Sequence, residues 1–396
     1  MGYDNLFKPI KINNLELKNR VVMAPMAMND ASPAGCPSEQ SKAMYAARAK
    51  GGVGLIILGG TFSTKWAWET TPFQGCYGMD LDDYIPSMSE LAERVHAFDS
   101  KIFVQLMPCL GRQGTSRFRG IQPVSCSAEP CVIKEDDFPE GMKFPGGVTY
   151  ETPRELQISE ITDMEDRAVQ ASLRAVTAGF DGIEIPLHRG YLPFSFLSPR
   201  INRRNDLYGG SLQNRMRFAV NIIRKTREKI GPDFPLGVEL VCNEHVEGGL
   251  TIPDCVEIAA ILENEGVDYV SLADACYEKT KIALPETDGL MLDHGEPQAF
   301  KKVLKIPVIA HSIHSPDLAE KALNEGTADM FETGRQLLVD PEFVAKVREG
   351  RTAEIKKCDR DNFCMLRLFL GLPVRCKLNP NLGRERYVSE YWQPAE

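Results

Sequence analysis

The chain has 396 residues, of which 43% are hydrophobic and 26% are charged, and its formal net charge is −9. This length and composition suit one large core, alone or with a small appended module, and argue against a disordered chain. The acidic balance argues against binding to nucleic acid or to anionic membranes, because both attract basic surfaces. The chemistry of small molecules is the function class that remains favoured.

Two further features concern the compartment. No stretch reaches the roughly 18 apolar residues that span a bilayer, and the first residues, "MGYDNLFKPIKINN", lack the apolar centre of a signal peptide, so we expect a cytoplasmic protein. The chain also contains 11 cysteines. In a reducing compartment, clustered thiols more often bind metal or stay free than form disulfides.

Short β-branched runs recur along the chain, and each is followed by a helix-like amphipathic segment, several of which end in glycine. The runs are RVVMAP at 20–25, VGLIIL at 53–58, KIFVQL at 101–106, DGIEI at 181–185, LGVELV at 236–241, DYVSLA at 268–273, IPVIAH at 306–311 and TADMFE at 327–332. No GxGxxG fingerprint follows the first run, and the "GGVG" at 51–54 precedes its strand and is read as a turn. Eight alternations of strand and helix therefore predict an α/β fold, a (β/α)8 TIM barrel, rather than a doubly wound sheet.

Polar side chains follow the fourth predicted strand, where His188, Arg189 and Tyr191 occur in "IEIPLHRGYLPFSFLSP". In a barrel of this kind the active site lies at the C-terminal ends of the strands, which places these three residues on the chemical face. The long segment 109–155, which is rich in Pro, Gly and Ser, follows the third strand on the same face. We expect it to act as a lid over the pocket.

The chain resembles the Old Yellow Enzyme family of FMN-dependent oxidoreductases over residues 5–350. The resemblance rests on "LFKPIKINNLELKNRVVMAPM", "GGVGLIILGG", "QLMPCLGRQG", "GYLPFSFLSPRINRRNDLYGGSLQNRMRF" and "ADMFETGRQLLVDPEF", in that order. Within the family it is most similar to the iron-sulfur branch that contains dienoyl-CoA reductases and bile-acid and steroid oxidoreductases. The predicted organisation is an FMN-binding barrel over 1–350 and a cysteine-containing extension over 351–396, without the FAD- and NAD-binding domains of larger relatives.

The resemblance implies a role for several residues of this chain. Tyr191 would give a proton to the substrate carbon while reduced flavin gives a hydride, a task that suits a phenol protonated at pH 7. The residues implied to contact FMN are Ala24, Pro25, Met26 and Ala27 behind the ring, Gly60 against it, Gln105 at the pyrimidine edge, and Ser312, Gly334 and Arg335 at the phosphate.

The chain departs from the family pattern at three places. The histidine pair that holds the substrate carbonyl is replaced by Pro186 and Arg189, and His188 between them is read either as a substrate hydrogen-bond donor or as a structural residue. The arginine that faces the flavin is replaced by Glu239, which would oppose negative charge on reduced flavin. We expect Arg189 to pair with Glu239 and to restore a cation there. The turn after the seventh strand, "AHSIHSP", lacks the usual glycines, which leaves its backbone contacts to the cofactor in question.

Cysteines cluster in the extension, where Cys358, Asp361, Cys364 and Cys376 follow the spacing C-x2-D-x2-C-x11-C. The iron-sulfur branch resembles this motif, with cysteine in place of Asp361. Three thiolates and a weaker carboxylate ligand predict a 4Fe-4S cluster, with a three-iron or labile cluster and a cluster lost in evolution as the alternatives. The other eight cysteines show no ligand spacing and are read as core or loop thiols.

The sequence as a whole predicts an FMN-dependent reductase of an activated C=C bond in an enone, enoate or enoyl thioester, including steroid-like rings. Its electrons would come from NAD(P)H or from a separate redox partner, and a homo-oligomer is compatible with the sequence. The first alternative is an amine dehydrogenase or demethylase, favoured by the loss of the carbonyl-holding histidines. The second is a noncatalytic or electron-relay subunit of a flavoprotein complex, favoured by the altered flavin contacts.

Overall fold

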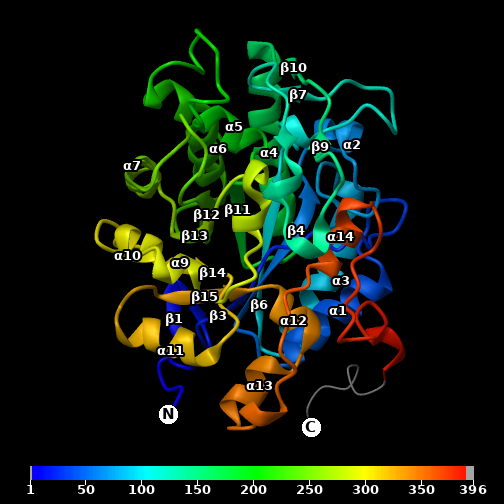
Figure 1. Cartoon of the computed structure of the whole chain (residues 1–396), viewed down its shortest axis with the longest axis vertical. Helices are drawn as coiled ribbons and strands as arrows, with labels where there is room; N and C mark the ends of the chain where they lie inside the picture. Colours follow the sequence, from blue (N-terminus) through cyan, green and yellow to red (C-terminus); the bar gives the residue numbers. More distant parts are fainter. Residues whose placement is uncertain (1, 389–396) are drawn as a thin grey trace.

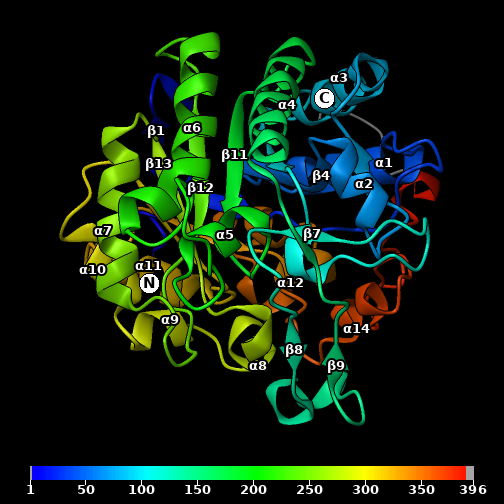
Figure 2. The same ribbon diagram turned by 90° about the horizontal axis from the view of Figure 1, so that it is seen from above.

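A computed structural model describes residues 2–388 of the chain. Eight parallel strands close into a barrel surrounded by helices, as predicted (Figures 1 and 2). In barrel order the strands are β3 (Val21–Met23), β4 (Leu55–Phe62), β6 (Lys101–Met107), β11 (Gly182–Leu187), β12 (Leu236–Val241), β13 (Tyr269–Ala273), β14 (Val308–His311) and β15 (Met330–Thr333). Pairing of β15 with β3 and of β3 with β4 closes the ring.

The outer helices form where the amphipathic segments predict them. They are α1 (Glu39–Lys50), α3 (Ile85–His96), α4 (Ile158–Thr177), α6 (Leu212–Ile230), α7 (Ile252–Asn264), α11 (Pro316–Asn324) and, after β15, α12 (Arg335–Val339) and α13 (Phe343–Arg348). Local chemistry sets their ends: α4 begins with a capping box between Gln157 and Glu160, and α6 ends at Gly231, whose φ of 83° suits glycine.

The floor of the barrel is an apolar plug. The antiparallel hairpin of β1 (Ile10–Ile12) and β2 (Leu15–Leu17) packs Ile12 and Leu17 against side chains from inside the barrel, such as Phe103. The N-terminal end of the barrel is therefore closed by hydrophobic burial. Polar chemistry is left to the opposite end, where the loops follow the strands.

The segment after β6 carries two small pairs of strands. β7 (Val124–Ser125) pairs with β10 (Arg154–Glu155), and β8 (Val132–Ile133) pairs with β9 (Val148–Thr149). Side chains around the second pair form a small apolar cluster with α14 (Phe363–Phe369) of the C-terminal extension. Figure 2 shows this hairpin beside α14. The insert is therefore packed against the extension, and its role as a lid stays a prediction.

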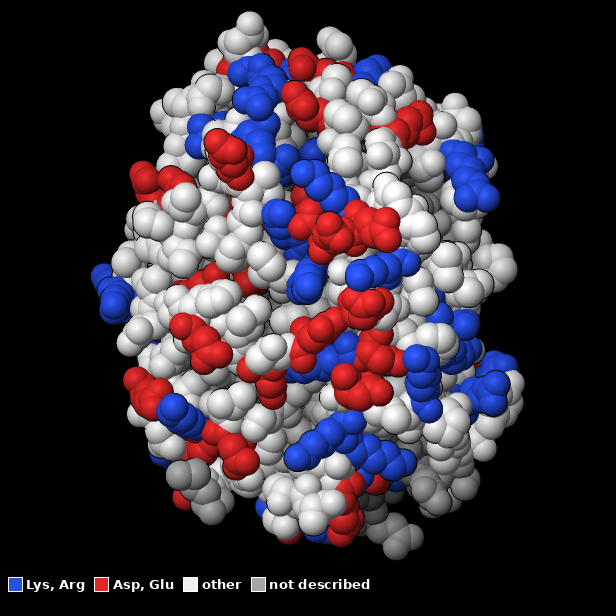
Figure 3. All heavy atoms as spheres, in the orientation of Figure 1, with Lys and Arg blue, Asp and Glu red and all other residues white. Residues whose placement is uncertain are grey.

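The distribution of surface charge and the apolar character of the helices concern possible binding partners. On the face that Figure 3 shows, acidic and basic side chains are interspersed, and no basic tract dominates it. Among residues 2–388, no helix combines the length and the apolar character that crossing a membrane requires.

Candidate active site

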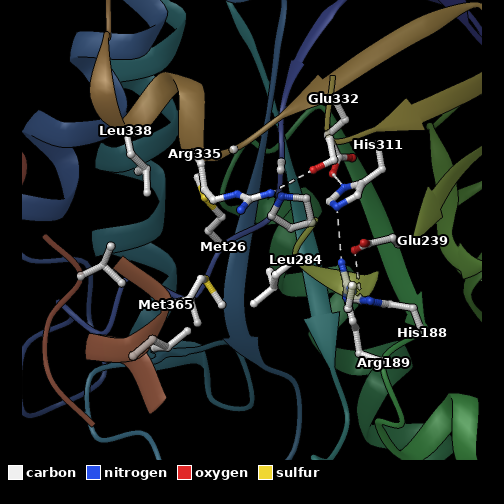
Figure 4. A pocket seen from close by; sticks show the side chains of 18 of the residues that line it. Met26, His188, Arg189, Glu239, Leu284, His311, Glu332, Arg335, Leu338 and Met365 are labelled. Atoms are coloured by element: carbon white, nitrogen blue, oxygen red, sulfur yellow. Dashed lines mark hydrogen bonds and ion pairs between the residues drawn. The ribbon is translucent and has the colours of Figure 1, made fainter. Parts of the chain in front are cut away.

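A cavity opens at the C-terminal ends of the barrel strands and encloses about 1000 Å³ of empty space, including its opening to solvent (Figure 4). Eleven of the residues predicted to bind cofactor or substrate line it: Ala24, Pro25, Met26, Ala27, His188, Arg189, Tyr191, Glu239, Ser312, Gly334 and Arg335. These residues come from five different strand ends. The structure therefore brings together positions that lie as far apart as 24 and 335 in the sequence.

The cavity wall behind residues 24–27 depends on a close approach of two strands. A Cβ atom on Gly59 would lie 2.4 Å from the backbone nitrogen of Met26, and one on Gly60 would lie 3.1 Å from Cα of Ala27. Gly60 also has a φ of +67°, which favours glycine. Gly60 thus supports the segment 24–27 from behind but is not among the described residues that line the cavity.

Gln105, predicted to meet the pyrimidine edge of a flavin, is buried one layer deeper. Its Nε2 donates to Oε1 of Glu184 at 2.9 Å and to Oε2 of Glu239 at 2.6 Å. It is likewise absent from the described residues that line the cavity. In this structure its amide joins two buried carboxylates.

The loop after β11 holds His188, Arg189 and Tyr191 in the cavity. Arg189 has a φ of +59°, and its carbonyl accepts hydrogen bonds from Nε2 of Gln113 and from the backbone N–H of Tyr277. Its guanidinium donates to the carbonyl of Asp274 at 2.9 Å and approaches Nε2 of His311 at 3.4 Å. The backbone turn therefore directs Arg189 across the next strands and not toward Glu239.

Glu239 is instead paired with His188, whose Nε2 lies 3.0 Å from Oε2 of the carboxylate (Figure 4). Burial alone would raise the pKa of Glu239, but His188, His311 and Arg189 lower it to about 2. The expected pair of Arg189 with Glu239 is thus wrong, and Glu239 pairs with His188. The carboxylate is charged, and three nearby side chains offset its charge.

His188 lies at 6% exposure, and neither of its ring nitrogens makes a hydrogen bond within the described residues. The contact with Glu239 has an ion-pair distance but lacks hydrogen-bond geometry. Because a buried polar group without a hydrogen bond is costly, an unsatisfied imidazole beside a cavity is a natural point of contact for a ligand.

Tyr191 begins the short helix α5 (Leu192–Leu197), and its hydroxyl lies 2.8 Å from the hydroxyl of Tyr277. Burial, and then the neighbouring Tyr277, raise the pKa of Tyr191 well above its usual value. Burial also raises the pKa of Tyr277. Both phenols are therefore protonated at neutral pH, and Tyr191 holds a proton inside the cavity.

A cationic corner lies at the end of β15. Arg335 is 7% exposed, and burial and then Arg360 lower its pKa to about 10. His314 lies in the same corner, where burial and both arginines lower its pKa to about 2, and its buried Nδ1 has no hydrogen-bond partner within the described residues. Because neighbouring cations lower one another's pKa, a bound anion such as a phosphate group would stabilise this corner.

The turn after β14 keeps a glycine-like backbone without glycine. Ser312 has a φ of +64°, its hydroxyl accepts a hydrogen bond from Arg335 at 3.3 Å, and its carbonyl accepts one from Arg360. At Gly334, a Cβ atom would lie 2.8 Å from Sδ of Met26. Ser312, Gly334 and Arg335 therefore form the compact corner that the sequence predicted for a phosphate.

Residues that the sequence analysis did not single out complete the cavity: Met28, Phe73, Tyr277, Ala283, Leu284, His311, His314, Glu332, Leu338, Met365, Leu368 and Val374. His311 and Glu332 form a second histidine-carboxylate pair, with Nδ1 3.2 Å from Oε1. Both are final residues of predicted strands, so their position at the chemical end of the barrel was a usable signal. Met365, Leu368 and Val374 come from the extension and carried no such signal.

The four predicted metal ligands of the extension, Cys358, Asp361, Cys364 and Cys376, line one smaller cavity of about 290 Å³. Arg335 and Leu338 border both this cavity and the large one. Burial raises the pKa of Cys364 to about 12 although Arg335 opposes the shift. The carboxylate of Asp361 is engaged by Nζ of Lys377 at 2.7 Å and by the backbone N–H of Phe363 at 3.0 Å.

Comparison with known proteins gives the class. The model of the NADH:flavin oxidoreductase / NADH oxidase family matches residues 5–354, so the chain belongs to this family. It is 40% identical to NADH oxidase of Thermoanaerobacter brockii over 99% of this chain and 58% of that protein. It is 34% identical to cinnamate reductase of Clostridium sporogenes over 97% of this chain and 59% of that protein. N,N-dimethylglycine/sarcosine dehydrogenase of Chromohalobacter salexigens is 32% identical over 97% of this chain and 54% of that protein.

Solved structures agree with this class. A 2-naphthoyl-CoA reductase complex superposes with a TM-score of 0.88 and 29% identity over 97% of this chain and 58% of that chain. The old yellow enzyme homologue of Zymomonas mobilis gives 0.74 and 27% over 89% of this chain and 94% of that chain. The resemblance to the Old Yellow Enzyme family is thus confirmed. The chain spans somewhat more than half the length of the three curated relatives named above.

The residues present fit the flavin cofactor of the family. The cationic corner, in which Arg335 and Arg360 lie near the unpartnered buried Nδ1 of His314, suits a phosphate. Glu239 is a poor match because the family has an arginine there, although His188, His311 and Arg189 lower its pKa. Gln105 and Gly60 also depart from the expectation, since neither is among the described residues that line the cavity.

Proposed function

We propose that this chain is an FMN-dependent oxidoreductase that reduces an activated C=C bond in an enone, enoate or enoyl thioester, including those on steroid-like rings. The observation that carries the proposal is the Tyr191 hydroxyl, a protonated phenol that shares the cavity with the guanidinium of Arg189 and the imidazole of His188. That imidazole lies at ion-pair distance from Glu239 but makes no hydrogen bond within the described residues. A proton donor beside two carbonyl-binding groups is the arrangement that such a reduction requires.

In this proposal the segment 24–27 would support the flavin ring, and Ser312, Gly334 and Arg335 would hold the phosphate. When bound, FMN would supply a hydride to one carbon of the alkene. Tyr191 would hold its proton at Oη for the neighbouring carbon, and Tyr277 would orient that hydroxyl through the 2.8 Å hydrogen bond. His188 and Arg189 would bind the substrate carbonyl or carboxylate and so polarise the double bond.

The charges of the cavity favour this substrate class over an amine. Each lining carboxylate already has a histidine partner, Glu239 with His188 and Glu332 with His311. Arg189 makes its polar contacts with a carbonyl oxygen and an imidazole, so its positive charge faces a substrate without a carboxylate partner. A cationic amine would meet this charge, although the similarity to a dimethylglycine/sarcosine dehydrogenase keeps amine oxidation as the second candidate.

The test uses flavin-loaded protein, with NADH as reductant and cinnamate as the probe alkene. Tyr191→Phe should leave flavin reduction by NADH unchanged and slow cinnamate-dependent reoxidation by about 10²-fold or more, the usual loss for a missing general acid. Tyr277→Phe is the matched control, because it removes the partner hydroxyl and leaves the donor, and its loss should be smaller.

Three results would redirect the proposal. Equal turnover in Tyr191→Phe and wild type would remove Tyr191 from the mechanism. Reduction of the flavin by sarcosine, with no reaction toward cinnamate, would favour the amine dehydrogenase. Protein that shows no flavin absorbance after reconstitution with FMN would favour a noncatalytic or electron-relay subunit.

We further propose a 4Fe-4S cluster in the cavity of the extension, which would pass electrons from a redox partner when NAD(P)H does not reach the flavin directly. Cys358, Cys364 and Cys376 supply three thiols at one cavity, whereas Asp361 would first have to leave Lys377. In anaerobic preparations, Cys364→Ala should lose most of its iron, and Asp361→Cys should retain or gain it. Iron-free wild-type protein from iron-replete, oxygen-free expression would contradict the cluster.

A further inference from the structure

A second cluster of metal-ligating side chains lies outside the cavity, where the loops after β12 and β13 meet α10 (Glu296–Lys301). Cys242 follows β12 directly, His245 comes three residues later, Asp274 follows β13 directly, and Glu296 begins α10. Figure 1 shows α10 beside α7 and the strands β13 and β14, on the side of the barrel away from α14.

Donor atoms of Cys242, Asp274 and Glu296 all lie within 4.8 Å of one another, and all three residues are buried. Sγ of Cys242 is 3.7 Å from Oδ1 of Asp274. Nε2 of His245 lies 2.7 Å from the same carboxylate oxygen and 3.7 Å from Oε1 of Glu296. Tetrahedral ligands at the usual zinc distances of about 2.0–2.3 Å are about 3.3–3.8 Å apart, so only small side-chain movements separate this cluster from a coordination sphere.

Glu296 gives an independent indication of a missing partner. Its exposure is 0%, and neither carboxylate oxygen makes a hydrogen bond within the described residues. Two imidazoles lie at ion-pair distance from its carboxylate, His245 at 3.7 Å and the half-exposed His294 at 3.9 Å. A buried carboxylate without hydrogen bonds is expensive, and a metal ion is one of the few groups that compensate it.

The backbone supports the same interpretation. His245 has a φ of +53° and Ala275, next to Asp274, has a φ of +61°, conformations that cost energy for residues with a side chain. These turns direct the imidazole of His245 and the carboxylate of Asp274 toward one another. The backbone strain thus falls on one proposed ligand, His245, and on the residue next to another, Asp274.

We propose that Cys242, His245, Asp274 and Glu296 form a binding site for zinc or a similar divalent transition-metal ion. A thiolate, an imidazole and two carboxylates are a borderline-soft set that favours such ions over magnesium or calcium, which prefer oxygen ligands alone. Binding would release the thiol proton of Cys242 and one proton from the imidazole of His245, because the ligands are a thiolate and a neutral imidazole. Four protein ligands leave no open position, so the site is structural and fixes the loops after β12 and β13.

These loops are connected to the large cavity. The carbonyl of Asp274 accepts the hydrogen bond of Arg189, and Tyr277 lies three residues further along the chain. A metal ion here would therefore hold the segment that carries the acceptor of Arg189 and the partner of Tyr191. The inference does not depend on FMN or on the proposed reaction.

The experiment measures zinc by elemental analysis and by competition with a chromophoric chelator, in full-length wild-type protein that has been stripped of metal and then given zinc. Loss of a residue that only supports a ligand costs about 10–100-fold in affinity. Cys242→Ser and Glu296→Gln, which remove direct ligands, should therefore each weaken zinc binding by at least about 100-fold. Cys109→Ser, another buried thiol, is the matched control and should bind zinc as wild type does.

Cys364→Ala distinguishes zinc bound at the thiols of the extension from zinc bound at the proposed site. This variant should keep the zinc of the proposed site. Cobalt(II) offers a second readout, because a thiolate-to-cobalt absorption band should appear in wild type and vanish in Cys242→Ser. Should Cys242→Ser not fold, Glu296→Gln, which keeps the side-chain shape, decides alone. The proposal is overturned if stripped wild-type protein takes up no zinc, or if Cys364→Ala loses the zinc that both site variants keep.

Discussion

Glu184 on β11 and Glu239 on β12 are two buried carboxylates that share one hydrogen-bond donor, Nε2 of Gln105, yet their acidities differ in direction. Burial and the negative charges of Glu239 and Glu332 raise the pKa of Glu184 well above its usual value. Burial acts on Glu239 in the same way, but His188, His311 and Arg189 lower its pKa to about 2. Burial acts alike on both side chains, so their different neighbours set the opposite directions of the two pKa values.

Glu184 and Glu239 also differ in their surroundings, and Glu239 stands where the family has an arginine. The raised pKa of Glu184 favours its neutral form, and its Oε2 accepts a hydrogen bond from the hydroxyl of Tyr269 at 3.0 Å inside the barrel. Glu239 lines the cavity as an anion, together with the histidines and the arginine that offset it. Basic side chains thus surround Glu239 although the family arginine is absent: His188 and Arg189 come from the loop after β11, and His311 ends β14.

The largest change in the free energy of unfolding is expected from Glu239→Gln. This substitution removes a buried charge but keeps the shape of the side chain and its contact with Gln105. Removal of one member of a buried pair can cost several kcal/mol, and the loss is smaller here because glutamine keeps the polar contact with Gln105. We expect a loss of about 1–3 kcal/mol in the free energy of unfolding at pH 7, measured by urea denaturation at a fixed excess of FMN. Stability equal to that of wild type would mean that the surrounding cations do not act on Glu239.

The low pKa of Glu239 also sets a pH window for this loss. A carboxylate whose folded pKa is depressed adds stability above its unfolded pKa of about 4.3, and that stability disappears as the pH falls toward the folded value. The cost of Glu239→Gln should therefore be complete at pH 7 and shrink below about pH 4.3. A cost that stays the same below about pH 4.3 would assign it to lost packing.

How much of this could be predicted from the sequence differs between fold and site. The eight strands were predictable because each is a compact apolar run followed by an amphipathic helix. Glu239 and Arg189 were found because motif register places them at strand ends. Their pairing was predicted wrongly, because it depends on the φ of +59° at Arg189, which turns the guanidinium toward Asp274.

The cysteines of the extension and the cluster around Cys242 show the same limit of prediction from sequence. Cys358, Cys364 and Cys376 lie within 19 residues, so their spacing indicated a ligand set. Cys242 was read as an ordinary core thiol, because two of its neighbours in the cluster, Asp274 and Glu296, lie more than 30 residues away and meet it only through the closure of the barrel. Spacing reveals local sites, whereas sites assembled from several strand ends need the register of the sheet.

Glu184→Gln is expected to change the free energy of unfolding less than Glu239→Gln does, and in the opposite direction. A carboxyl that is neutral when folded and charged when unfolded lowers stability as the pH rises above its unfolded pKa of about 4.3. Glutamine is neutral in both states, so the variant should match wild type at pH 4 and be equally stable or up to about 2 kcal/mol more stable at pH 7. Urea denaturation at the two pH values measures this difference, and a variant that loses stability as the pH rises would show that Glu184 is charged in the folded protein.

The smallest effect concerns which cation acts on Glu239, and two double-mutant cycles measure it. His188 lies 3.0 Å from the carboxylate, whereas Arg189 is directed to Asp274 and contributes less to the lowered pKa. We expect His188→Ala with Glu239→Gln to show a coupling of about 1 kcal/mol in the free energy of unfolding, and Arg189→Ala with Glu239→Gln to stay below about 0.5 kcal/mol. Alanine suits the second cycle because it keeps a Cβ atom at the positive φ of residue 189, so the backbone strain is the same in both arms. If the arginine cycle gave the larger coupling, Arg189 would be the partner of Glu239 in solution, as their places on neighbouring strands first indicated.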